Sequence, residues 1–146
     1  MRELPRQLSV DELAELFEGR TRFVELLAER ENPLGVAQEV ARQLTDEQKK
    51  EVLAAHPAIG ERKGLSSRSA AEQGTGDDPA VLEELARLNR EYEERFGFRF
   101  VVFVNRRPRS QIVPILHERL ERTRDHELDT ALDELVSIAK DRWRRG

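Results

Sequence analysis

The sequence contains no cysteine, and only one of its 146 residues is Trp and one is Tyr. Without cysteine the chain has no disulfide framework and no thiolate chemistry, so it tolerates a reducing compartment. No apolar run approaches the roughly 20 residues that a membrane-spanning helix needs, and the first residues lack the apolar core of a signal peptide. We therefore expect a cytoplasmic protein that does not enter a membrane.

Aromatic side chains make up only 5% of the residues, whereas charged side chains make up 37%. This balance is typical of amphipathic helices around a common core and not of an aromatic-rich β-sandwich. The length suits one domain covering residues 1–146. The net charge of −4 argues against sequence-independent binding to nucleic acid, which needs a basic surface.

Apolar residues recur at spacings of three and four along most of the chain, and residues that start or stop helices bound these stretches. Ser9 and Asp78 are candidate N-caps, Thr45 and Gln48 have the form of a capping box, and Gly19 offers a stop. The expected helices cover 10–18, 21–31, 34–44, the stretch from Thr45 to His56, a short segment from Ser69, 79–95, 110–120 and 125–144. The sequence thus predicts an all-α fold, a compact single-domain bundle of about seven to nine helices.

Residues 98–104 are β-branched and aromatic, and local propensity alone favours a strand there. A single strand leaves its backbone groups unpaired, and the chain offers no convincing second strand. We therefore expect this segment to be a buried extended connection between helices.

A titratable group lies where one helix must stop. His56 precedes Pro57, which ends or kinks the helix before it, and Ser69, Glu72 and Gln73 follow after a stretch rich in Gly and Ser. An imidazole near a carboxylate and an amide is suited to proton transfer. The same residues also have a purely structural interpretation, because a His before Pro is commonly a helix end and Ser-x-x-Glu is a capping box.

Three stretches, in this order and spacing, resemble one family: 56–60 (HPAIG), 69–73 (SAAEQ) and 89–101 (NREYEERFGFRFV). Together with the sequence of residues 119–143, these three stretches are similar to 2-oxo-4-hydroxy-4-carboxy-5-ureidoimidazoline (OHCU) decarboxylases of urate degradation. The resemblance implies cofactor-independent decarboxylation of OHCU to (S)-allantoin by an all-helical homodimer that needs no metal. Many relatives have a longer His-Pro-Asp-Leu-Ala-Gly form of the first motif, so the pocket rim differs here.

The resemblance also implies roles for individual residues. His56 matches the catalytic proton carrier and Glu72 its acidic partner. The positions that match contacts to the substrate are Pro57, Ser69, Gln73, Phe100, Val101, Val102 and Arg142. In decarboxylation the substrate supplies its own electron sink, which is why no organic cofactor is required.

Two other functions fit the same residues. One is an enzyme that uses His56 and Glu72 on a related ureido or hydantoin ring, and the other is a non-catalytic helical module that binds a partner helix in an apolar groove. His117 and His126 lie among charged residues, and we expect both on the surface. A zinc site is not indicated, because the chain lacks the spacing of helical zinc ligands.

Overall fold

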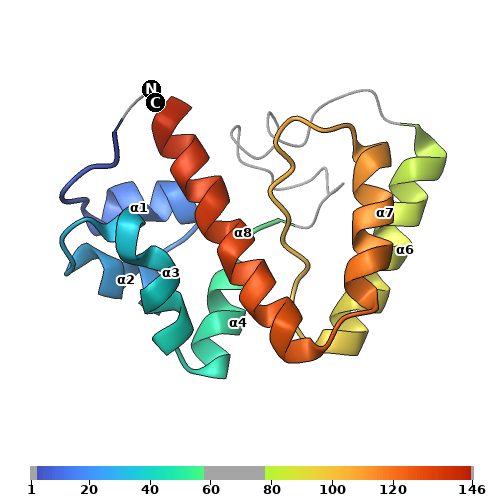
Figure 1. Cartoon of the computed structure of the whole chain (residues 1–146), viewed down its shortest axis with the longest axis horizontal. Helices are drawn as coiled ribbons and strands as arrows, with labels where there is room; N and C mark the ends of the chain where they lie inside the picture. Colours follow the sequence, from blue (N-terminus) through green and yellow to red (C-terminus); the bar gives the residue numbers. More distant parts are fainter. Residues whose placement is uncertain (1–2, 58–77, 146) are drawn as a thin grey trace.

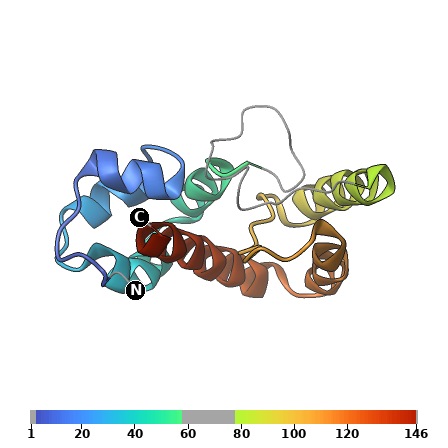
Figure 2. The same cartoon turned by 90° about the horizontal axis from the view of Figure 1, so that it is seen from above.

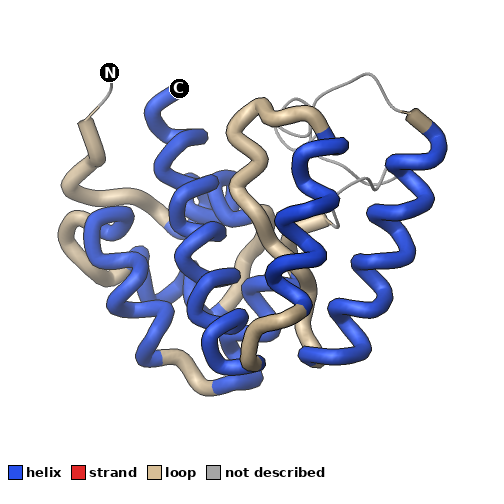
Figure 3. Tube along the Cα trace, turned by 45° about the vertical axis from the view of Figure 1, so that its right-hand side comes forward, coloured by secondary structure: helices blue, strands red, loops and turns tan. Residues whose placement is uncertain are grey.

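The computed structural model describes residues 3–57 and 78–145, and within these ranges it contains seven α-helices and no β-strand (Figure 3). The helices are α1 (Val10–Phe17), α2 (Arg22–Ala28), α3 (Pro33–Gln43), α4 (Asp46–Ala54), α6 (Pro79–Phe96), α7 (Arg109–Leu120) and α8 (Arg124–Arg145). The all-α prediction is confirmed. The short helix expected from Ser69 lies outside the described residues.

Local capping signals fix where several helices begin. The N–H of Glu12 donates to Ser9 Oγ at 3.1 Å and the N–H of Ser9 donates to Glu12 Oε1 at 3.0 Å, so α1 begins with a capping box. Thr45 and Gln48 form the same reciprocal pair at the start of α4. Asp78 caps α6 as predicted. These starts were predictable because each depends on residues within one turn.

Most boundaries differ from the prediction by one to three residues, and two of them have a clear local cause. The left-handed residue that closes α1 is Glu18, with φ of 66°, and not Gly19. Helix α7 begins at Arg109, one residue before the predicted start, with Pro108 in the N-cap position and no side-chain cap. The fixed φ of a proline suits the entry to a helix, so α7 begins after Pro108 without a side-chain cap.

Helix α8 runs through the middle of the molecule and joins two groups of helices. On one side it packs against α1, α3 and α4, while α6 and α7 pack together on the other side (Figure 1). Figure 2 shows the same division from above. Helices α6 and α7 run in the same direction, because residues 97–108 return along the length of the helices before α7 begins (Figure 1).

Residues 98–104 of this returning segment are extended and largely buried, as predicted. Phe98, Phe100, Val101, Val102 and Val104 are all buried in the same core as the helices. The N–H of Phe103 donates to Glu134 on α8 at 3.4 Å. Side chains and neighbouring helices therefore hold the segment where a sheet partner would otherwise be needed. None of the described helices has the length and apolar composition to cross a membrane.

Candidate active site

His56 lies just beyond the end of α4, as the sequence predicts. The last helical residue is Ala54, the N–H of His56 donates to the Leu53 carbonyl at 3.2 Å, and Pro57 prevents the helix from continuing. Only 4% of His56 is exposed. A helix end thus places an imidazole in the interior, where few polar side chains are found.

The imidazole of His56 is neutral over the physiological pH range. Burial, and after it the charges of Arg142 and Arg99, lower its pKa from the ordinary 6.5 to about 3, while Glu18 acts in the opposite direction. An unperturbed imidazole would exchange protons near neutrality, and burial removes that property from His56. The buried Nε2 has no hydrogen-bond partner among the residues that the structure describes, so this imidazole is available as a base.

The end of α1 meets the end of α4 at this point, and α8 contributes a cation. A Cβ placed on Gly19 would lie 3.5 Å from the Ala55 Cβ, in ordinary contact. Arg142, which is 2% exposed, donates from Nη1 to the Leu16 carbonyl at 3.1 Å and from Nη2 to Glu18 Oε1 at 3.0 Å. The structure therefore brings Arg142 into the electrostatic environment of the imidazole, and its contact with substrate stays a prediction.

Arg99 anchors the backbone that carries His56. Its Nη1 donates to the His56 carbonyl at 2.5 Å and to the Ala54 carbonyl at 3.3 Å, while its Nε donates to Glu93 at 3.2 Å. A cation that binds the last carbonyls of a helix also interacts favourably with the helix dipole. Arg99 was not predicted as a functional residue, because its partners lie far from it in the sequence.

The predicted pocket wall at residues 100–102 is fixed from the side of α6 and α7. The Phe100 ring packs edge-on against Tyr92 with centroids 5.2 Å apart, and the Arg119 guanidinium lies over the Phe100 ring at 4.5 Å. Arg119 Nη1 also donates to the Val101 carbonyl at 2.7 Å. Val102 is buried next to them in the chain. Arg119 thus contacts both the backbone of the wall, at the Val101 carbonyl, and one of its side chains, the Phe100 ring.

A buried carboxylate holds that anchor in place. Glu127 is completely buried; its Oε1 accepts from the Tyr92 hydroxyl at 2.6 Å and from Arg119 Nε at 2.7 Å, and its Oε2 lies 3.6 Å from Arg122. Burial raises the pKa of Tyr92 and outweighs the charge of Arg119, which lowers it. The Tyr92 hydroxyl therefore stays protonated and donates to Glu127. Glu127 therefore accepts two hydrogen bonds on Oε1 and forms an ion pair with Arg122 through Oε2, which compensates its buried charge.

Several predicted residues are not tested by this arrangement. Ser69, Glu72 and Gln73 lie outside the described residues, and their roles stay predictions. His117 and His126 are exposed, as expected. In the described parts of the chain, no three His, Asp or Glu side chains gather closely enough to hold a metal ion.

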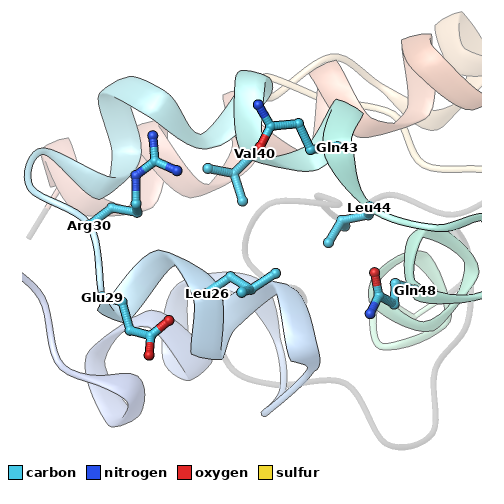
Figure 4. A pocket seen from close by; sticks show the side chains of 7 residues that line it. All are labelled: Leu26, Glu29, Arg30, Val40, Gln43, Leu44 and Gln48. Atoms are coloured by element: carbon cyan, nitrogen blue, oxygen red, sulfur yellow. The ribbon is translucent and has the colours of Figure 1, made fainter.

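Two pockets open on the surface of the described parts of the chain. One, of about 260 Å³, opens between α2, α3 and the start of α4 (Figure 4). Its lining residues are Leu26, Glu29, Arg30, Val40, Gln43, Leu44 and Gln48. The other, of about 270 Å³, lies on the outer side of the Arg99 anchor and is lined by Lys50, Ala54, Glu93, Gly97, Phe98 and Arg99. Neither contains a residue predicted to bind substrate.

The fold and the site define a class: an all-helical protein with a neutral buried imidazole close to a buried cation, suited to moving a proton on an anionic ligand. A family model described as OHCU decarboxylase matches residues 2–144. The chain therefore belongs to the OHCU decarboxylase family of urate degradation.

Individual relatives agree with this assignment. A 2-oxo-4-hydroxy-4-carboxy-5-ureidoimidazoline decarboxylase of Haloferax volcanii is 36% identical over 98 residues, which cover 64% of this chain and 58% of the relative. The protein of the same name from Halalkalicoccus jeotgali is 34% identical over 112 residues, which cover 72% of this chain and 64% of the relative. The matched region thus spans less than two thirds of either relative's length.

A solved structure shows the same fold. The crystal structure of an OHCU decarboxylase in the presence of (S)-allantoin superposes with a TM-score of 0.74 over 92% of this chain and 96% of the other, at 24% identity. At that identity the likeness concerns the fold alone, and it confirms the all-helical architecture independently of the sequence motifs.

Proposed function

We propose that this chain decarboxylates OHCU to (S)-allantoin in urate degradation, with His56 as the proton carrier and Glu72 as its acidic partner. The observation that supports this most is the Nε2 of His56, which is buried, neutral and without a hydrogen-bond partner among the described residues. A general base must be unprotonated and able to reach the proton that it takes. Family membership supplies the substrate, because two relatives are named for this decarboxylation.

The reaction needs one group that first accepts and then returns a proton. When the C4 carboxylate leaves as CO₂, its electron pair forms a C4–C5 double bond and the former C5–N π pair moves onto nitrogen, which takes a proton from solvent. His56 then removes the C4 hydroxyl proton as the C4 carbonyl forms, and the C4–C5 π pair accepts that proton at C5. Delivery to one face of C5 produces a single enantiomer, so the position of His56 sets the stereochemistry.

Arg142 and Glu72 act on the same substrate in this proposal. The planar guanidinium of Arg142 binds a substrate oxygen, and its positive charge favours an anionic substrate. Glu72 orients His56 or accepts from a ring or ureido N–H, while Ser69 and Gln73 contact the ureido group. The substrate's own C5–N double bond accepts the electrons, so we propose catalysis without metal or organic cofactor. The active species is a homodimer, which sedimentation equilibrium tests.

The activity is tested on OHCU generated in solution from urate by the two preceding reactions, urate oxidation and hydrolysis of its product. Circular dichroism follows the chirality of the allantoin, because OHCU also decays unaided to racemic product. The purified chain should accelerate allantoin formation and give the S enantiomer. Slow formation of racemate at the unaided rate would contradict the proposal, and assays on other ureido and hydantoin rings would then be needed.

A further inference from the structure

Glu18 occupies a backbone position that glycine adopts at lower cost. With φ of 66° and ψ of 18° it forms the left-handed turn that closes α1, although a glycine follows directly in the sequence. A residue with a Cβ is disfavoured in this conformation. Such strain persists where the surrounding structure requires that particular side chain. The side-chain contacts of Glu18 therefore need an explanation beyond helix termination.

The Glu18 carboxylate is directed at the buried cation of the site. It is 14% exposed and lies 3.0 Å from Nη2 of Arg142, while the same guanidinium donates from Nη1 to the Leu16 carbonyl at 3.1 Å. The end of α1 therefore presents two acceptors to one planar side chain that extends from α8. Two contacts in different directions fix the plane of a guanidinium, whereas one contact leaves it free to rotate.

The two charges also reach His56 with opposite sign. Arg142 lowers the pKa of the imidazole and Glu18 raises it, although burial has the largest effect. Arg99, from the segment after α6, is the other described charge that acts on this group, and it also lowers the pKa. The pair of Glu18 and Arg142 is thus part of the environment of the proposed proton carrier.

We propose that Glu18 is a positioning residue of the active site, which holds the Arg142 guanidinium against the end of α1 and so sets where Arg142 meets the substrate. The substrate part of this inference rests on the proposed function. The positioning itself concerns two residues of this chain and is testable without substrate.

The first test is a double-mutant cycle on activity toward OHCU, with Glu18→Gly and Arg142→Met alone and together. Glu18→Gly removes the carboxylate and relieves the backbone strain. In the otherwise unchanged protein it should lower kcat/KM roughly tenfold. In the Arg142→Met background it should lower kcat/KM by less than about twofold, because a residue that acts through another contributes nothing once its partner is gone. Equal losses in both backgrounds would overturn the inference.

Glu18→Gln keeps an oxygen that can accept from Arg142 and should therefore lose less activity than Glu18→Gly. The matched control is Asp133→Asn, which removes another carboxylate paired with an arginine across α8, at 3.2 Å from Arg42, on the surface. This control should leave kcat/KM unchanged. A loss in the control equal to that of Glu18→Gly would show that any broken ion pair on α8 has this effect, and the inference would be wrong.

The second test uses urea denaturation of the same four proteins and needs no substrate. Each single variant should lower the midpoint, because Glu18→Gly removes the carboxylate that lies against a buried guanidinium and Arg142→Met removes the contacts of that guanidinium with α1. The double variant should unfold at a higher urea concentration than the sum of the single shifts predicts, because both substitutions remove the same ion pair. Additive shifts would overturn the positioning role. If the chain is inactive on OHCU but the shifts are non-additive, only the proposed function fails.

Discussion

His56 stays neutral because an imidazolium at that position would lose its hydration and would lie close to the charge of Arg142. In the unfolded chain the charged imidazole carries no such penalty, so His56 takes up its proton at a higher pH in the unfolded chain than in the folded one. The folded-state pKa is about 3 against 6.5 in the unfolded chain, and between these values only the unfolded chain carries the proton. Stability must therefore fall as the pH is lowered from 6.5 toward 3 and must be independent of His56 above that window.

This gives a measurable difference between the wild type and His56→Gln. From pH 7 to pH 5 the wild type should lose about 2 kcal/mol more of its free energy of unfolding than the variant, at about 1.4 kcal/mol per pH unit once the unfolded histidine is protonated. Urea denaturation of both proteins at the two pH values checks this. Carboxylates titrate alike in both proteins and cancel in the comparison, so parallel losses would show that His56 is not buried as described.

At the scale of single residues, the sequence predicts candidate site residues but not the surroundings in which they lie. His56 was found from Pro57 and the motif around it, and Arg142 from a match in the last helix. The low pKa of His56 was not predictable, because it arises from burial by parts of the chain distant in sequence. Glu18 was missed for a related reason, since the adjacent Gly19 looked like the residue that stops α1.

At the scale of elements, the segment of residues 97–108 depends on a polar network and not on a sheet. Arg119 binds the Val101 carbonyl, and Glu127 and Tyr92 hold Arg119 in place. The network joins α6, α7 and α8 to the segment. Removing one member should therefore affect the backbone of the segment as well as the helices.

Glu127→Gln should cost about 3–5 kcal/mol of the free energy of unfolding, because it leaves Arg119 buried without its counter-ion. Hydrogen exchange should also become faster at the amides of residues 98–104. The matched control is Glu118→Gln, which removes the exposed partner of Arg122 at 3.0 Å and should cost less than about 1 kcal/mol. A cost for Glu127→Gln as small as that of the control would contradict the network's role.

The helices themselves were largely predictable, whereas the path between α6 and α7 was predictable only in part. The capping boxes at Ser9 and Thr45 and the cap at Asp78 are local signals, and the structure has all three. The extended state of residues 98–104 followed from the lack of a partner strand. Its fixation by Arg119 and Glu127 could not be predicted, because no local pattern links residues separated by a loop and a helix turn.

At the scale of the whole molecule, the site is formed by ends of elements that are far apart in the chain. The end of α1, the end of α4, the last turns of α8 and the start of the 97–108 segment converge at His56. Helix α8 makes this possible because it packs against α1, α3 and α4 and accepts hydrogen bonds from the other side through Glu127 and Glu134 (Figure 1). An all-helical class follows from periodicity, but this convergence is a tertiary property that periodicity does not contain.

In the proposed function, the buried imidazole of His56 delivers the proton that makes allantoin chiral. The most direct test measures the enantiomeric composition of allantoin formed from OHCU by the wild type and by His56→Gln, with both proteins shown to be folded by far-ultraviolet circular dichroism. The wild type should give the S enantiomer rapidly, and the variant should give racemate at the unaided rate. A folded His56→Gln protein that still forms (S)-allantoin at a near-normal rate would contradict the account.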